Sequence, residues 1–239
     1  MILPDRRLEQ LTLALATARR GDDVKAVHQL RVASRRLDAW LRIGGHRVLR
    51  DDLAGLRASC GRVRNLDVLL ERESSPRPFR EWLVTEGAGA RAALQAALVD
   101  PRVDATVEAL ARMPGIPDVV ARKNVRRALA KVAERGAEVA SQLDDLEALH
   151  ALRRAIRGLR FALEWLDERA PFLVELQDAF GELNDTAVLV GLLHQFLDAD
   201  PAFVRATDAD LARARKAAVK AWNNAEPDLM KMAGTWNSL

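Results

Sequence analysis

Histidine and arginine recur in one pattern at residues 27–41 and 149–163 of this chain. Each stretch contains His-x-x-Arg-x-x-x-Arg, a spacing that places the three side chains on one side of an α-helix. Guanidinium groups present planar donors that match phosphate oxygens, and histidine adds a donor that gains charge beside an anion. The pattern therefore predicts a site for a phosphate-rich anion. Its residues are His28, Arg31, Arg35 and Arg36 in the first stretch with Arg42 directly after it, and His150, Arg153, Arg157 and Arg160 in the second.

A stripe of arginines on a helix is often only a solvated surface. Two features argue against that interpretation here. Neither stretch places a Glu four residues ahead of each Arg, which is how exposed helices commonly offset their charge. The same spacing also occurs in both stretches, although the residues between have diverged. Cations repeated in this way favour a bound anion.

The elements that position these side chains are predicted to be amphipathic helices. Val27, Leu30, Leu37 and Leu41 recur at spacings of three, four and seven, so they share a face beside the basic stripe. A second pair of similar segments follows, at residues 56–69 and 176–189, and aligns glycine with glycine and valine with valine. Two matched blocks in the same order indicate an internal duplication that gives two similar half-domains.

These motifs together resemble the CHAD (conserved histidine α-helical domain) family. The resemblance rests on the His-x-x-Arg-x-x-x-Arg helix followed by a Leu/Phe-Gly-x-x-x-Asn/Asp helix, both present twice, and it covers nearly the whole chain. It implies two pseudo-symmetric four-helix bundles with a basic surface that binds inorganic polyphosphate. Three positions depart from the family pattern. Asp38 and Gly158 occupy positions where basic residues are usual, so the two stripes carry less positive charge than the family pattern implies. Asn65 occupies a position where Asp is common.

Composition independently favours an all-α globular protein. The 239 residues are 49% hydrophobic, contain no Tyr, and are rich in Ala, Leu and Arg. No stretch alternates with period two, so no sheet is expected. Pro114-Gly115-Ile116-Pro117 is the clearest linker, which predicts half-domains at residues 1–113 and 114–239. The last helix is expected over residues 201–225.

Charge and cysteine content limit the function classes. A net charge of only +3 does not by itself indicate a polyanion ligand, so that prediction depends on the clustering of the basic residues. Cys60 is the only cysteine, which excludes an intramolecular disulfide and fits a reducing compartment. The N-terminal residues have no apolar signal core, and the longest uncharged apolar run, 186–197, is too short to span a bilayer. We expect a cytoplasmic protein, which is compatible with association with polyphosphate granules.

Few other residues suggest chemistry. Neither His46 nor His194 has a companion His, Asp or Glu at metal-ligand spacing, and the arginines beside His28 and His150 would repel a metal ion. No nucleotide loop or nucleophile elbow is present, so we predict no metal, no cofactor and no enzyme activity. His46 is interpreted as a surface residue at a helix start, and His194 as a partly buried core residue. Asp67 and Asp185 are expected to be structural, holding an arginine or capping a turn.

Two further helices carry basic residues that could complete the anion site. They contribute Arg122 and Arg126 in one helix, and Arg213, Lys216 and Lys220 in another, although ordinary solvated surface is the alternative interpretation.

The function predicted from the sequence is thus binding of inorganic polyphosphate by a helical protein, with no membrane association. Two alternatives stay open. The same cations would attract the phosphates of DNA or RNA, although the only aromatic residues in the stripes, Trp40 and Phe161, fit the core better than base stacking. A helical adaptor could instead use the stripes to bind an acidic protein partner. The oligomeric state is not indicated.

Overall fold

The computed structural model describes residues 1–21, 24–72, 75–141 and 145–237, and within them the chain is all-α. The described residues contain no β-strand; an isolated antiparallel bridge joins Ile2 to Ile116. The predicted fold class is therefore confirmed. The helices are α1 (Asp5–Arg20), α2 (Val24–Ile43), α3 (Arg50–Leu70), α4 (Arg77–Leu98), α5 (Pro101–Ala111), α6 (Asp118–Ser141), α7 (Leu146–Glu164), α8 (Pro171–Leu193) and α9 (Pro201–Asn237).

The chain divides into two compact units, Met1–Pro117 and Asp118–Leu239. The Pro/Gly linker at 114–117 forms the end of the first unit. None of the described helices combines the length and the continuous apolar sequence that a membrane-spanning segment requires.

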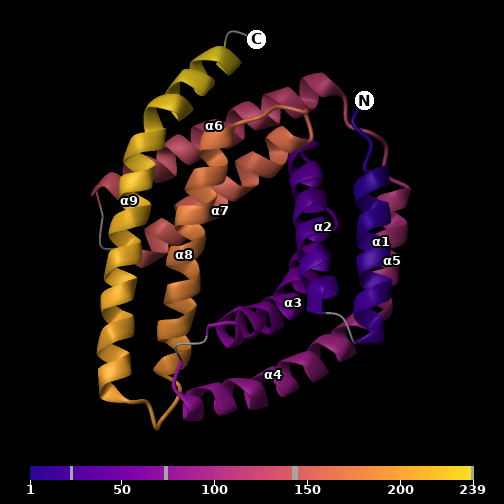
Figure 1. The fold of residues 1–239 in the computed structure, drawn as a ribbon. Coiled ribbons are helices and arrows are strands. Elements are labelled where there is room, and N and C mark those ends of the chain that lie inside the picture. Colours follow the sequence, from indigo (N-terminus) through magenta and orange to yellow (C-terminus); the bar gives the residue numbers. More distant parts are fainter. Residues whose placement is uncertain (22–23, 73–74, 142–144, 238–239) are drawn as a thin grey trace. The chain divides into compact units, whose positions relative to one another are not determined.

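In the first unit, α1 to α4 form a closed bundle in which each helix packs against the next and α4 returns to α1 (Figure 1). The short helix α5 adds to this bundle by packing on α1 and α3. The N-terminal segment is tied down by Ile2, which exchanges two backbone hydrogen bonds with Ile116 and accepts another from the Trp40 indole at 3.0 Å. Leu30, Trp40 and Leu53 are fully buried in the core.

In the second unit, α6 to α9 form another four-helix bundle, closed by contacts between α9 and α6. Figure 1 shows α9 running beside α8 and continuing past its end. The prediction that this helix stops at residue 225 is wrong, because it extends through Pro227 to Asn237. Packing explains the difference: Trp222, Leu229 and Trp236 continue one buried apolar stripe across the proline.

Two histidines lie in environments other than those predicted. His194 is exposed and caps the C-terminal end of α8, so its assignment to the core is wrong. The apolar run that contains it ends with Leu193, which is buried, and the helix stops one residue later. His46 lies half-buried in the turn before α3, with its ring 6.2 Å from that of Trp40.

Candidate functional site

Helix α2 carries the first basic stripe because its opposite face belongs to the core. Val27, Leu30, Leu37 and Leu41 are all buried, as the 3–4 spacing predicts. This fixes the helix by its apolar face and leaves His28 exposed and Arg31, Arg35 and Arg36 half-buried beside it. The helix ends where Gly45 adopts a φ of 75°, a left-handed conformation that costs glycine no steric strain.

Helix α3 contributes basic residues that the sequence interpretation did not include. Arg50, Arg57 and Arg64 are seven residues apart, so they share one face of α3. His28, Arg35 and Arg42 have the same spacing on α2, which packs against α3. The two rows run in opposite directions, so that His28 is close to Arg64 while Arg42 and Arg50 meet at one carboxylate. We call this set the basic ladder: His28, Arg35, Arg42, Arg50, Arg57 and Arg64.

The His28 end of the ladder is strongly cationic. Partial burial, and then repulsion from Arg64, Arg31 and Arg35, lowers the pKa of the His28 imidazole from its ordinary value. The Arg31 guanidinium also ties the two helices together, since its Nη1 donates a 3.3 Å hydrogen bond to the Gly61 carbonyl of α3. Arg64 itself is only partly offset by the exposed Glu71, at 3.4 Å.

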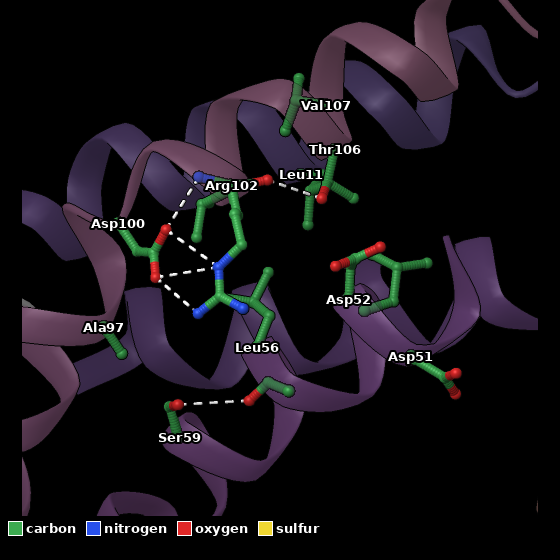
Figure 2. Close-up of a pocket in the computed structure, with 13 residues that line it drawn as sticks. Leu11, Asp51, Asp52, Leu56, Ser59, Ala97, Asp100, Arg102, Thr106 and Val107 are labelled. Carbon is green, nitrogen blue, oxygen red and sulfur yellow. Dashed lines mark hydrogen bonds and ion pairs between the residues drawn. The ribbon is translucent and has the colours of Figure 1, made fainter. Parts of the chain in front are cut away.

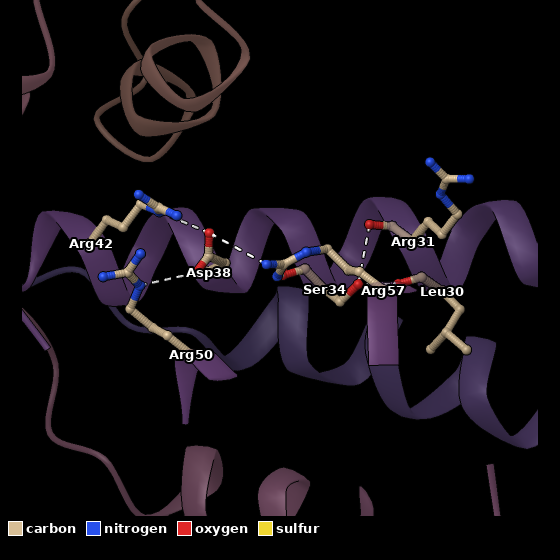
Figure 3. A network of polar contacts seen from close by, with 7 residues as sticks. All are labelled: Leu30, Arg31, Ser34, Asp38, Arg42, Arg50 and Arg57. Atoms are coloured by element: carbon tan, nitrogen blue, oxygen red, sulfur yellow. Dashed lines mark hydrogen bonds and ion pairs between the residues drawn. The ribbon is translucent and has the colours of Figure 1, made fainter. Parts of the chain in front are cut away.

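At the other end of the ladder, three arginines converge on the buried carboxylate of Asp38 (Figure 3). Arg42 Nε donates to Oδ2 at 2.8 Å, and Arg50 Nε donates to Oδ1 at 3.1 Å. The Arg57 guanidinium lies 3.9 Å from Oδ2. Burial would raise the pKa of the Asp38 carboxyl, but the hydrogen bonds and charges of the arginines outweigh it and hold that pKa below its ordinary value. We call these four residues the Asp38 cluster.

In the second unit, α7 carries the corresponding stripe. The helix begins at Asp145, whose carboxylate accepts from the backbone N–H groups of Glu147 and Ala148, at 2.8 and 3.2 Å. Its apolar face is buried, and His150 is half-buried. Burial first, and repulsion from Arg153 next, lower the pKa of the His150 imidazole. Arg153 and Arg157 are also half-buried.

The helix beside this second stripe has a different charge. Helix α8 contains no Lys or Arg and has four acidic residues. Where α3 has Arg57 and Arg64, the aligned positions of α8 are Gln177 and Asn184. Arg160 consequently donates a 2.7 Å hydrogen bond to Gln177 Oε1, and its guanidinium lies 4.6 Å from the centre of the Phe161 ring. The two stripes are therefore similar on their own helices but differ in the helix that each packs against.

The additional basic residues of the second unit fall into two groups. Arg122 forms an ion pair with Glu168 at 3.6 Å and stacks over the Trp236 ring at 5.4 Å, while Arg126 donates to the Trp236 carbonyl. These two arginines thus hold the end of α9 against α6. Lys216 and Lys220 are exposed on α9. Arg213, also exposed, is ion-paired with Asp210.

A pocket of about 220 Å³ in the first unit lies between α1, α3 and α5, and it has the wrong charge for an anion (Figure 2). Its polar lining includes Asp51, Asp52 and Asp100. Arg102 also lines it, but Nε and Nη2 of its guanidinium both donate to the Asp100 carboxylate. Within the described part of the chain, no group of three His, Cys, Asp or Glu side chains could hold a metal ion.

Residues 4–194 match the family model described as the CHAD domain. The chain belongs to the CHAD family. This family is associated with polyphosphate binding. No curated protein sequence matches the chain.

Solved structures agree with this assignment at the level of the fold. The CHAD domain from the plant Ricinus communis superposes with a TM-score of 0.68 at 22% identity, over 99% of this chain and 90% of that one. PptA from Streptomyces chartreusis gives a TM-score of 0.69 at 18% identity, over 96% of this chain and 97% of that one.

Several residues of this CHAD domain have structural partners that the sequence only partly predicted. Asp67 is buried and ion-paired with Arg91 of α4, which confirms its expected role of holding an arginine. Asp185 instead accepts a hydrogen bond from the neighbouring Asn184 amide, at 3.1 Å. Trp40 and Phe161 are buried, in agreement with their interpretation as core residues.

Proposed function

We propose that this CHAD domain binds inorganic polyphosphate, with the basic ladder of α2 and α3 as its principal contact surface. The observation that carries the proposal is the concentration of cations around His28. Arg31, Arg35 and Arg64 come from two packed helices, and their joint repulsion contributes to the lowered pKa of the imidazole. An anion placed there would relieve this repulsion and would favour the protonated imidazole.

The geometry suits a linear ligand. Along α2, His28 and Arg42 are separated by about 21 Å at 1.5 Å rise per residue, so one ladder offers donors to several successive phosphates. Each guanidinium supplies a fork of N–H donors, which matches the oxygens of a phosphate group. The stripe of α7, comprising His150, Arg153, Arg157 and Arg160, is proposed as a second and weaker contact surface. Lys216 and Lys220 could extend it.

The proposed role is binding without catalysis, in the cytoplasm and beside polyphosphate granules. Duplex nucleic acid is the competing ligand, because its phosphates would be attracted by the same cations. The ladder contains no aromatic side chain on which bases could stack. Polyphosphate, which needs only charge and phosphate recognition, is therefore the better match.

The test is a gel-shift titration with labelled long-chain polyphosphate, competed separately by unlabelled polyphosphate, duplex DNA and pyrophosphate. We expect unlabelled polyphosphate to compete well and DNA to compete poorly at equal phosphate concentration. Affinity should also fall steeply with salt, with a slope on the order of one for each phosphate contact in a plot of log affinity against log salt concentration. Equal competition by DNA would contradict the proposal and favour general phosphate-backbone binding. An affinity that does not change with salt concentration would indicate an apolar or protein ligand.

A further inference from the structure

We propose that the three arginines of the Asp38 cluster form a distinct subsite, organised by the Asp38 carboxylate, that takes a compact group of condensed phosphate. The inference rests on the proposed function, which supplies the class of ligand. It adds the location of a binding subsite and gives Asp38 the role of orienting the arginines of that subsite. An acid in a polyanion site would ordinarily be expected to weaken binding. The contacts of this acid suggest the opposite.

The charge of the cluster is unbalanced. Among the described residues, Asp38 is the one carboxylate within ion-pair distance of these three guanidinium groups. One negative charge against three positive charges leaves an excess of two. Two of the three guanidinium groups are partly buried, since the side chains of Arg50 and Arg57 are only 28% and 20% exposed, whereas that of Arg42 is 55% exposed. Like charges in partly buried surroundings repel each other strongly, so a bound anion would be favourable.

Arg57 shows the effect of this imbalance. Burial lowers the pKa of its guanidinium, and although Asp38 opposes the change, Arg42 and Arg50 add to it by repulsion. Arg57 is held in place by the Ser34 carbonyl, which its Nη1 approaches at 3.5 Å. It therefore stays beside two other cations that the single carboxylate does not neutralise.

Donor orientation also leaves room for a ligand. Asp38 receives only the Nε–H of Arg42 and the Nε–H of Arg50, one on each carboxylate oxygen. A guanidinium has five N–H donors, so the Nη groups of both arginines stay available for another acceptor. In the view of Figure 3, these two guanidinia approach Asp38 from one side and that of Arg57 approaches from the other. The carboxylate thus fixes the orientation of several forks while using few of their donors.

The position of the cluster fits the continuation of a chain ligand. Arg35 and Arg42 are two helical turns apart on the same face of α2, about 10 Å along the axis. A phosphate chain that contacts the His28 end of the ladder would therefore reach the Asp38 cluster by following α2. A ligand too short to follow the whole ladder is expected to bind at the cluster, because three guanidinium groups converge there on one carboxylate.

The decisive variant is Asp38→Asn, tested for binding of inorganic tripolyphosphate by titration calorimetry. The substitution makes the protein more positive. We nevertheless expect affinity to fall by about tenfold or more, because the guanidinium groups of Arg42 and Arg50 lose the charged carboxylate that orients them. Glu108→Gln is the matched control: Glu108 is also paired with an arginine, Arg112, but on the exposed surface of α5, and its loss removes the same charge. We expect Glu108→Gln to leave affinity unchanged. Tighter binding by Asp38→Asn would overturn the proposal.

Because Asp38→Asn could also loosen the fold, a second series keeps the carboxylate. Arg50→Ala should weaken tripolyphosphate binding by about tenfold, and Arg50→Lys should restore only part of it, since lysine keeps the charge and loses the fork. Arg112→Ala is the control for charge. Full binding by Arg50→Lys would show that charge alone matters and would overturn the proposed geometry.

Comparing the binding of long-chain polyphosphate with that of tripolyphosphate distinguishes a failure of this inference from a failure of the proposed function. If the unaltered protein binds neither long-chain polyphosphate nor tripolyphosphate, the proposed function fails. If Arg31→Ala weakens binding of long-chain polyphosphate while Asp38→Asn and Arg50→Ala leave tripolyphosphate binding unchanged, only the Asp38 subsite is wrong.

Discussion

The indole ring of Trp222 lies directly against the backbone of Gly136, so that a β-carbon added to this glycine would fall 1.8 Å from Cζ2 of the ring. The contact joins α9 to α6 inside the second unit, where both residues are buried. Only glycine permits so close an approach of the two helices. This glycine is therefore explained by packing and not by backbone conformation.

Gly136→Ala should destabilise the second unit. Overpacking a core commonly costs about 1–3 kcal/mol, and here the obstacle is a rigid, fully enclosed ring. Gly191→Ala in α8 is the matched control, because a β-carbon there meets no atom within 4 Å. That change should be neutral or stabilising by about 0.5–1 kcal/mol, the difference in helix propensity. Urea denaturation measures both, and equal free energies of unfolding for the two variants would contradict the packing argument.

Cys60 should be unreactive in the folded protein. It is fully buried in α3, and burial raises the pKa of its thiol to about 11 even though the nearby Arg31 charge opposes the shift. The thiolate is the reactive form, so both burial and the high pKa protect the residue. We expect a thiol reagent at neutral pH to label Cys60 only when the first unit opens. Rapid labelling of the native protein would contradict this, whereas labelling that rises with urea would report the stability of that unit.

Mildly acidic pH should have opposite effects on stability and on ligand binding. Burial and neighbouring arginines lower the pKa values of His28 and His150 in the fold, so the unfolded chain takes up these protons first. Stability without ligand should therefore fall as pH decreases through about 6.5, the unfolded value, towards the lower folded pKa values. Bound polyphosphate reverses the preference, since an anion favours imidazolium, and affinity should rise over the same window.

The measurement for this prediction is the free energy of unfolding and the polyphosphate affinity from about pH 8 to about pH 5.5, where histidine changes charge. The double variant His28→Gln/His150→Gln should flatten both curves. A double variant that keeps the full pH dependence of binding would show that the two histidines are not responsible.

The sequence predicted the parts of this fold that depend on local pattern. The 3–4 spacing of apolar residues located α2 and α7, and Gly45 and Asp145 mark helix ends by local backbone chemistry. The predicted end of α9 at residue 225 is wrong because tertiary packing continues the helix through Pro227, although an interior proline ordinarily ends or kinks a helix. Trp236 lies beyond the proline, and its ring and carbonyl are both engaged by arginines of α6, a contact over more than a hundred residues of sequence.

The candidate site likewise has a part that local sequence pattern predicted and a part that depends on tertiary packing. The basic residues of α2 were predicted, because they follow a short repeat within one helix. Arg50, Arg57 and Arg64 also have a regular spacing in the sequence, but its meaning depends on which face of α3 meets α2. The role of Asp38 could not be predicted either. From the sequence, Asp38 only reduces the positive charge of the stripe, whereas in the structure its carboxylate is the shared partner of three arginines. Side-chain convergence from separate helices cannot be obtained from spacing alone.

The unequal surroundings of the two stripes lead to a prediction about their unequal importance. Arg31→Ala/Arg35→Ala removes two cations from the first unit, where α3 supplies further arginines that can act on the same ligand. Charge-assisted hydrogen bonds contribute roughly 1.5–3 kcal/mol each, so this double variant should weaken polyphosphate binding by about a hundredfold or more.

The aligned double variant, Arg153→Ala/Arg157→Ala, should weaken binding less, because α8 brings acidic residues and amides to its stripe. Arg112→Ala/Arg205→Ala removes the same charge from exposed positions outside both stripes, one at the C-terminal end of α5 and one on α9, and should change affinity little, since isolated exposed charges are strongly screened by salt. Gel-shift titrations at one fixed salt concentration compare the three variants, after circular dichroism has shown that each is folded. Equal losses in the two stripes would indicate that α7 contributes as much as the ladder. Equal losses in all three variants would mean that only net charge matters and that the basic ladder is not a specific site.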